Sequence, residues 1–133
     1  EMLRSLVGSE MCIRDSCGKW FGKIFAQTPD IDVLYLQDIG GRCLVDFDVD
    51  LPNWFAEIKK ACDANGVIFG VDIESFKECW CPRITMRTKP WIELEEQLRV
   101  AGMFTDHITN FSWATFKPGT DTYEGYKKYL ERK

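Results

Sequence analysis

The stretch that decides the fold is Val67–Phe76, VIFGVDIESF, an apolar run that ends in carboxylates. A run of this kind predicts a strand buried in a parallel sheet. Successive strand side chains point to opposite faces of the sheet. One face then carries the apolar residues Val67, Phe69, Val71 and Ile73. The other face becomes acidic toward its carboxyl end, and it carries Ile68, Gly70, Asp72 and Glu74.

The carboxylates that end this strand are the first candidates for a functional site. In parallel α/β folds, ligands and catalytic groups gather at the carboxyl ends of the strands. Glu74 is therefore the leading catalytic candidate, with Asp72 beside it on the same face. The alternative is that both are ordinary polar residues at the exit of a strand.

Strands and helices alternate on both sides of this stretch. Ile31–Asp38, IDVLYLQD, and Asp106–Trp113, DHITNFSW, predict two further strands. Apolar residues at helical spacing predict four helices. The residues that mark the ends of these helices are Pro29, Pro52, Asn65-Gly66, Pro90 and Gly102. The apolar face of the last helix consists of Tyr123, Tyr126 and Leu130. Ser75–Lys89 is expected to be a long irregular loop. The order α-β-α-β-α-β-α predicts repeated right-handed βα units on a parallel sheet.

Composition indicates one globular unit and narrows its partners. The chain has 133 residues, a formal net charge of −4 and 14% aromatic residues. A mildly acidic chain without a stripe of Lys and Arg is not expected to bind nucleic acid. No apolar run approaches the roughly 20 residues of a transmembrane helix. Neither a membrane anchor nor a signal peptide is expected in this sequence, and its compartment is left open.

The six cysteines indicate neither a disulfide framework nor a metal site. Cys79-Trp-Cys81 has one intervening residue where a zinc knuckle has two, and His107 is the only histidine. His107 lies at the entrance of the third strand and is expected to be structural. Gly40-Gly41 lacks the motif context of a phosphate-binding loop. No metal and no cofactor are therefore expected.

Residues 1–16 resemble a translated sequencing adapter. The segment Leu6–Asp15, LVGSEMCIRD, can be written in codons that match the read-through of a transposase adapter, as found in conceptually translated metagenomic assemblies. Segments of this origin are excluded from reasoning about the fold. We therefore expect residues 1–16 to lie outside the packed core and residues 17–133 to form the domain.

Three strand ends together resemble a known family. Gln37, Asp38 and Gly40 end the first strand, Glu74 and Phe76 end the second, and Phe111 and Trp113 end the third. This order resembles the carboxyl-terminal half of an uncharacterised (β/α)8-barrel family, a domain of unknown function related to glycoside hydrolases. The resemblance implies a partial barrel in which these are the sixth, seventh and eighth strands, with the amino-terminal half missing. The alternative is a complete small α/β domain with a three-stranded parallel sheet.

The resemblance also implies a carbohydrate substrate and two catalytic carboxylates. Glu74 matches the nucleophile at the end of strand seven in retaining barrel glycosidases, and nothing in the chain matches the acid/base of strand four. Asp38 is the second catalytic candidate, although it is at least as well explained as the cap of a turn. The expected substrate-binding residues are Gln37, Asp72, Phe76 and Trp113. Trp113 would offer a flat platform to a sugar ring, unless it belongs to the core.

Two classes of function follow for such a fragment. One is a carbohydrate-active hydrolase whose isolated fragment is inactive for want of the second carboxylate. The other is a non-catalytic sugar-binding or interaction module on the same barrel. A Glu or Asp at the end of strand four of the complete barrel would favour the enzyme.

Overall fold

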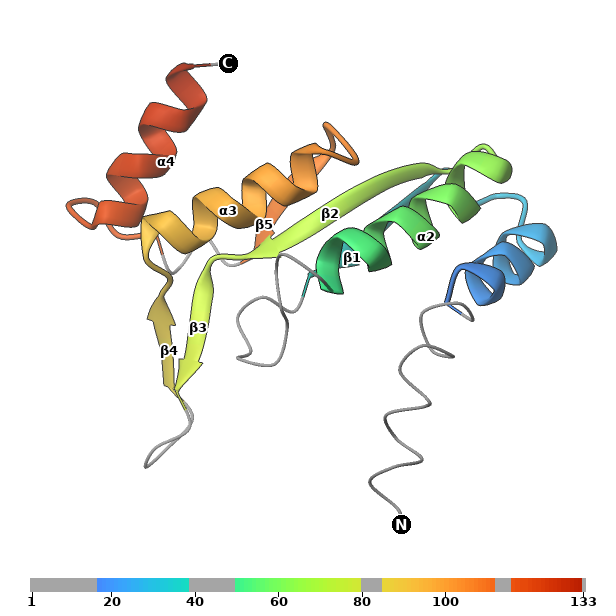
Figure 1. The fold of residues 1–133 in the computed structure, drawn as a ribbon, viewed down its shortest axis with the longest axis horizontal. Coiled ribbons are helices and arrows are strands. Elements are labelled where there is room, and N and C mark those ends of the chain that lie inside the picture. The colour runs from blue at the N-terminus through green and yellow to red at the C-terminus, as the bar shows by residue number, and fades with distance from the viewer. Residues whose placement is uncertain (1–16, 39–49, 80–84, 112–115, 133) are drawn as a thin grey trace, which may run out of the picture.

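The computed structural model describes residues 17–38, 50–79, 85–111 and 116–132, and it contains a three-stranded parallel sheet (Figure 1). The strands are β1 (Val33–Gln37), β2 (Ile68–Glu74) and β5 (Ile108–Phe111). The middle strand is β2, and both of its neighbours run parallel to it. The predicted parallel pairing in chain order is confirmed.

Helices connect the strands as the sequence predicts. Helix α2 (Asp50–Ala64) lies between β1 and β2 in the chain, α3 (Trp91–Gly102) precedes β5, and α4 (Asp121–Glu131) follows it. A further helix over residues 17–27 precedes β1. In Figure 1, β1 lies behind α2 and β5 lies behind α3. The described chain is therefore a partial parallel α/β domain, in agreement with the expected fold class.

The apolar face of β2 forms the centre of the core. Phe69, Val71 and Ile73 are at most 4% exposed, and the core includes Phe55 of α2 and Leu94 of α3. The rings of Phe55 and Phe69 lie 5.8 Å apart. The face predicted to pack under helices does so, because only that face offers a continuous apolar surface.

Helix α2 shows how sequence sets one of these elements. Pro52 is tolerated in the first turn, where its missing N–H has no partner in the helix. The buried stripe recurs at helical spacing and consists of Leu51, Phe55, Ile58 and Cys62. Burial raises the pKa of the Cys62 thiol to about 11, so this cysteine is an inert member of the core. Gly66, with φ +70°, ends the helix.

The prediction for Ser75–Lys89 was wrong, because this segment contains an antiparallel hairpin. Strand β3 (Phe76–Cys79) pairs with β4 (Thr85–Thr88), and Phe76 lies opposite Thr88. Each strand has only four residues, too few for alternation to stand out in the sequence. The predicted strand Val67–Phe76 is correspondingly divided at Ser75, with Phe76 in the hairpin rather than in the parallel sheet.

The hairpin is attached to the domain at its base and along its side. The Lys89 backbone N–H donates to the Ser75 carbonyl at 2.9 Å. The Lys77 ammonium forms an ion pair with Glu93 of α3 at 2.6 Å. The hairpin therefore extends from the end of β2 that carries Glu74, in the position seen in Figure 1.

The sheet face opposite the helices is open around a glycine. Tyr35 of β1 lies opposite Gly70 of β2, and a Cβ atom at Gly70 would come within 2.5 Å of the Tyr35 ring. Val33, Tyr35 and Ile68 on this face are 41%, 47% and 45% exposed. Gly70 thus gives the Tyr35 ring a flat surface, which is the usual reason for a glycine within a strand.

We expect Gly70→Ala to destabilise the protein through Tyr35 and not through the backbone. The new methyl group displaces the ring, at a cost of about 1 kcal/mol for the lost cross-strand contact. In a Tyr35→Ala background the same change should be neutral or stabilising, because alanine is the better strand residue. Urea unfolding of the four proteins of this double-mutant cycle measures the coupling. An equal cost of Gly70→Ala in both backgrounds would disprove the explanation.

Candidate functional site

The carboxyl ends of β1 and β2 lie side by side and bring four of the predicted site residues together. Gln37 is the register partner of Asp72. The Gln37 side-chain amide donates to Glu74 Oε1 at 2.9 Å, and the Glu74 backbone N–H donates to Asp38 Oδ1 at 3.1 Å. Asp72 accepts a hydrogen bond from the Thr109 hydroxyl of β5 at 2.8 Å. All three parallel strands therefore contribute to one polar edge.

The two candidate carboxylates belong to opposite faces of the sheet. Glu74 follows Asp72 by two residues in β2, so it shares the open face with Gly70 and Tyr35. Asp38 follows Leu36 by two residues, so their side chains lie on the same face. The Asp38 backbone N–H donates to the Asp72 carbonyl at 3.2 Å, which continues the hydrogen bonds between β1 and β2. Asp38 therefore projects toward the helices.

Asp38 is held within the helix layer by two donors. Its carboxylate is 2% exposed and accepts from the Glu74 N–H through one oxygen and from the Gln97 amide of α3 through the other. These contacts join the end of β1 to β2 and to α3. The alternative that Asp38 caps the turn before Gly40-Gly41 involves residues outside those described, and both that alternative and its catalytic role stay predictions.

The sequence analysis missed Lys89 and Gln97. Lys89 directly follows β4 and has no exposed surface, and its ammonium donates to Gln97 Oε1. Burial lowers the pKa of Lys89 from 10.5 to about 8, against the opposing effects of Asp38 and Glu74. Gln97 carries a signal that a closer reading could have used, because it is a polar residue within the buried stripe of α3.

The remaining predicted residues have different positions. Phe76, at the start of β3, is 3% exposed, so its ring lies within the protein. Asp72 is half-buried at the end of β2. Trp113 and Gly40 lie outside the described residues. The proposed contacts of Phe76, Asp72 and Trp113 with substrate stay predictions.

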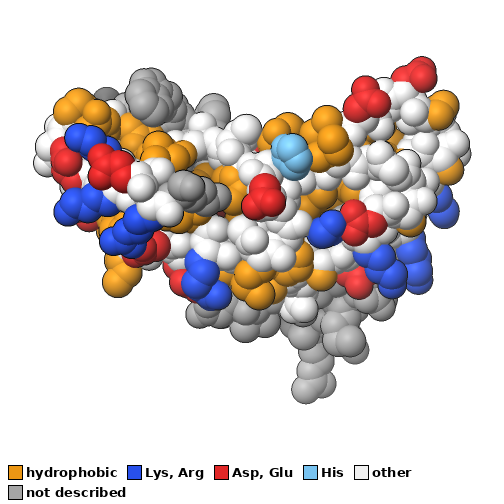
Figure 2. Space-filling model, turned by 90° about the horizontal axis from the view of Figure 1, so that it is seen from above, with side chains coloured by type: hydrophobic (Ala, Val, Ile, Leu, Met, Phe, Trp, Pro, Cys, Tyr) orange, Lys and Arg blue, Asp and Glu red, His pale blue; other side chains and the backbone are white. Residues whose placement is uncertain are grey.

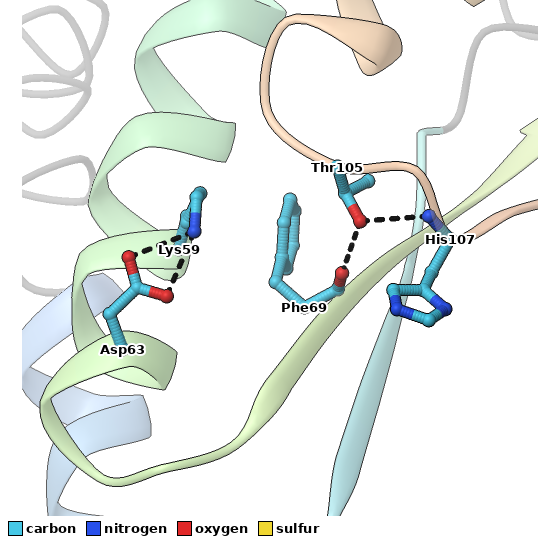
Figure 3. Close-up of polar contacts among 5 residues, drawn as sticks. All are labelled: Lys59, Asp63, Phe69, Thr105 and His107. Atoms are coloured by element: carbon cyan, nitrogen blue, oxygen red, sulfur yellow. Dashed lines mark hydrogen bonds and ion pairs between the residues drawn. The ribbon is translucent and has the colours of Figure 1, made fainter.

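His107 lies at the amino end of β5, away from the polar edge, as the sequence analysis expected. Its backbone N–H donates to the Thr105 hydroxyl at 3.0 Å, and that hydroxyl donates to the Phe69 carbonyl at 2.6 Å (Figure 3). These bonds tie the turn before β5 to the amino end of β2. Figure 3 also shows the ion pair between Lys59 and Asp63, four residues apart on α2.

Acidic and basic side chains are interspersed on the face shown in Figure 2. Among the described residues, no three His, Cys, Asp or Glu side chains are grouped closely enough to hold a metal ion. Within the same residues, none of the helices has the length and apolar character needed to cross a membrane.

Comparison with known proteins finds a likeness among the solved structures. No family model matches the chain, and no curated protein matches it either. The fold is similar to the crystal structure of a protein from Bacteroides thetaiotaomicron described as a "putative alpha-L-fucosidase", with a TM-score of 0.66 and 22% sequence identity. The similarity covers 86% of this chain and 36% of that one, so the chain spans about a third of the length of the protein it matches.

Proposed function

We propose that the chain is the carboxyl-terminal part of a (β/α)8 barrel that hydrolyses glycosyl bonds. The observation that carries this proposal is the position of Glu74, at the carboxyl end of the middle parallel strand, where its 5% exposed side chain shares the face of Gly70 and Tyr35 and accepts from the Gln37 amide. Glycoside hydrolases with this fold place their carboxylates at this end of the barrel. The likeness to a chain described as an alpha-L-fucosidase supports carbohydrate as the class of substrate.

The open face supports the partial barrel. In a closed barrel, the side chains of Val33, Tyr35 and Ile68 would face the interior and pack against the opposite strands. Here they are 41% to 47% exposed. The outer strands β1 and β5 would likewise pair with neighbouring strands. We propose that the remaining strands supply this wall and the second catalytic carboxylate, and that residues 1–16 are adapter-derived.

The geometry suggests how the polar edge would act on a glycoside. The Glu74 carboxylate would attack the anomeric carbon, or take a proton from the attacking water, while an acid on another strand protonates the departing oxygen. The Gln37 amide orients Oε1 of Glu74. Asp38 fixes the Glu74 backbone and is the second catalytic candidate of the chain. Asp72, Phe76 and Trp113 are proposed to bind the sugar.

We expect Glu74→Gln in the complete barrel to lower kcat for aryl glycosides by about a hundredfold to ten-thousandfold. The amide keeps the shape of the side chain but cannot act as nucleophile or base. Turnover of an aryl glycoside panel that includes α-L-fucoside provides the measurement. Glu124→Gln, on the exposed surface of α4, is the matched control and should retain full activity.

Two results would reject this mechanism. Equal rates for wild type and Glu74→Gln would remove Glu74 from the chemistry. A complete barrel that binds sugar by calorimetry but does not turn over any glycoside would instead identify the non-catalytic sugar-binding module. A Glu74→Ala variant adds a positive test, because azide entering the vacated space should restore turnover and leave as the glycosyl azide if Glu74 is the nucleophile.

We expect the 17–133 chain by itself to self-associate and to hydrolyse no aryl glycoside. The exposed apolar side chains on the open face would pack against a second copy, since two outer strands and an uncovered face favour association. Sedimentation velocity measures it. Ile68→Gln should reduce the association, whereas Ile92→Gln, at a 76% exposed position on α3, should not. Turnover by the 17–133 chain would overturn the half-barrel proposal.

A further inference from the structure

Lys89 is a buried cation that lies between the hairpin and the last two helices. Its backbone N–H donates to the Ser75 carbonyl, and its carbonyl accepts from the Thr122 hydroxyl of α4. Its side chain has no exposed surface, and the ammonium donates to Gln97 Oε1 of α3. A buried charge requires such partners, because desolvation otherwise disfavours the charged form.

The ammonium determines which way the Gln97 amide is turned. An ammonium group can only donate hydrogen bonds, so Gln97 must present its oxygen to Lys89. The amide nitrogen of Gln97 is then directed to Asp38 Oδ2, to which it donates. The other oxygen of Asp38 accepts the backbone N–H of Glu74. The buried chain of bonds therefore runs from Lys89 through Gln97 and Asp38 to the backbone of Glu74.

We propose that Lys89 is a positioning residue for Glu74, acting through the orientation of Gln97 and Asp38. Its significance for catalysis rests on the proposed role of Glu74 in glycoside hydrolysis. Without the ammonium, the buried oxygen of the Gln97 amide loses its donor, and the amide is held only through its bond to Asp38. The anchor of the Glu74 backbone at the end of β2 would then loosen.

The charges around Lys89 define where this positioning should depend on pH. Asp38 and Glu74 at the ends of β1 and β2, together with Glu93 of α3, favour the charged form, and Lys77 of β3 opposes it. Burial outweighs the carboxylates and lowers the pKa of Lys89 to about 8. The ammonium that orients Gln97 is therefore present below about pH 8.

Amide hydrogen exchange in the chain tests the positioning directly. Lys89→Met should reduce the protection of the Glu74 amide about tenfold or more, because its acceptor Asp38 is released. The protection of the Val71 amide, which donates to the His107 carbonyl at 2.9 Å in the same strand, should not change. Lys77→Met, which removes a neighbouring lysine paired with Glu93, is the matched control and should leave both amides protected.

Each outcome of that experiment decides the inference. Unchanged protection at Glu74 in Lys89→Met, or an equal loss at Glu74 and Val71, would overturn it. A second measurement uses no Lys89 variant, so it does not depend on whether such a variant folds. The pKa of Lys89, followed by NMR of labelled lysine, should fall further in Asp38→Asn than in Glu74→Gln. An unmoved pKa in Asp38→Asn would show that the cation and the polar edge are not coupled, because linkage is reciprocal.

We also expect the stability of wild type relative to Lys89→Met to rise between about pH 8 and pH 10.5. In this window the unfolded chain binds a proton at Lys89 that the folded protein does not, so raising the pH favours the folded state. Below pH 8 both states are protonated and the difference is constant. Denaturant unfolding at several pH values measures it, and a pH-independent difference would contradict a buried cation at Lys89.

Kinetics in the complete barrel separate this inference from the proposed function. Lys89→Met should lower kcat about tenfold and leave KM nearly unchanged, because a misplaced carboxylate affects the transition state more than binding. Equal kcat in wild type and Lys89→Met would overturn the inference. If wild type itself shows no turnover, the proposed function fails, and the exchange experiment still decides whether Lys89 positions Glu74.

Discussion

The polar edge depends on the hydrogen bonds that the buried carboxylate of Asp38 accepts. This carboxylate lies at the junction of β1, β2 and α3, and it accepts one hydrogen bond from the Glu74 backbone and one from the Gln97 side chain. Breaking either bond would remove a donor from a buried carboxylate, which is costly. The position of Glu74 is therefore coupled to the packing of α3, and the site is part of the fold.

The same junction explains why a lysine is buried in a small domain. Lys89 places a positive charge near Asp38 and Glu74, and part of the cost of burying each charge is offset by the others. The lowered pKa of Lys89 indicates that the compensation is incomplete. The burial of Lys89 is thus tied to the arrangement of the strand ends through Gln97 and Asp38.

The sequence predicts those parts of the fold in which the regular spacing of apolar residues continues long enough to be recognised. The apolar faces of β2 and α2 extend over several turns or pleats, so Phe69 and Phe55 could be placed in the core. The hairpin could not be predicted, because its strands have four residues each. Gln37, Asp38 and Glu74 were predicted from their places at strand ends. Lys89 was not, because its burial depends on tertiary contacts with α3 and α4.

The alternation of strand side chains places the two candidate carboxylates on opposite faces of the sheet. Asp38 lies on the same face as Leu36 and projects into the helix layer, where both of its oxygens accept hydrogen bonds. Glu74 lies on the same face of β2 as Gly70, and this is the face that a closed barrel would enclose. Substrates of such barrels bind at the carboxyl ends of the strands. If Glu74 acts as proposed, it would meet the substrate there, while the bond from its backbone N–H to Asp38 holds the end of β2 in place.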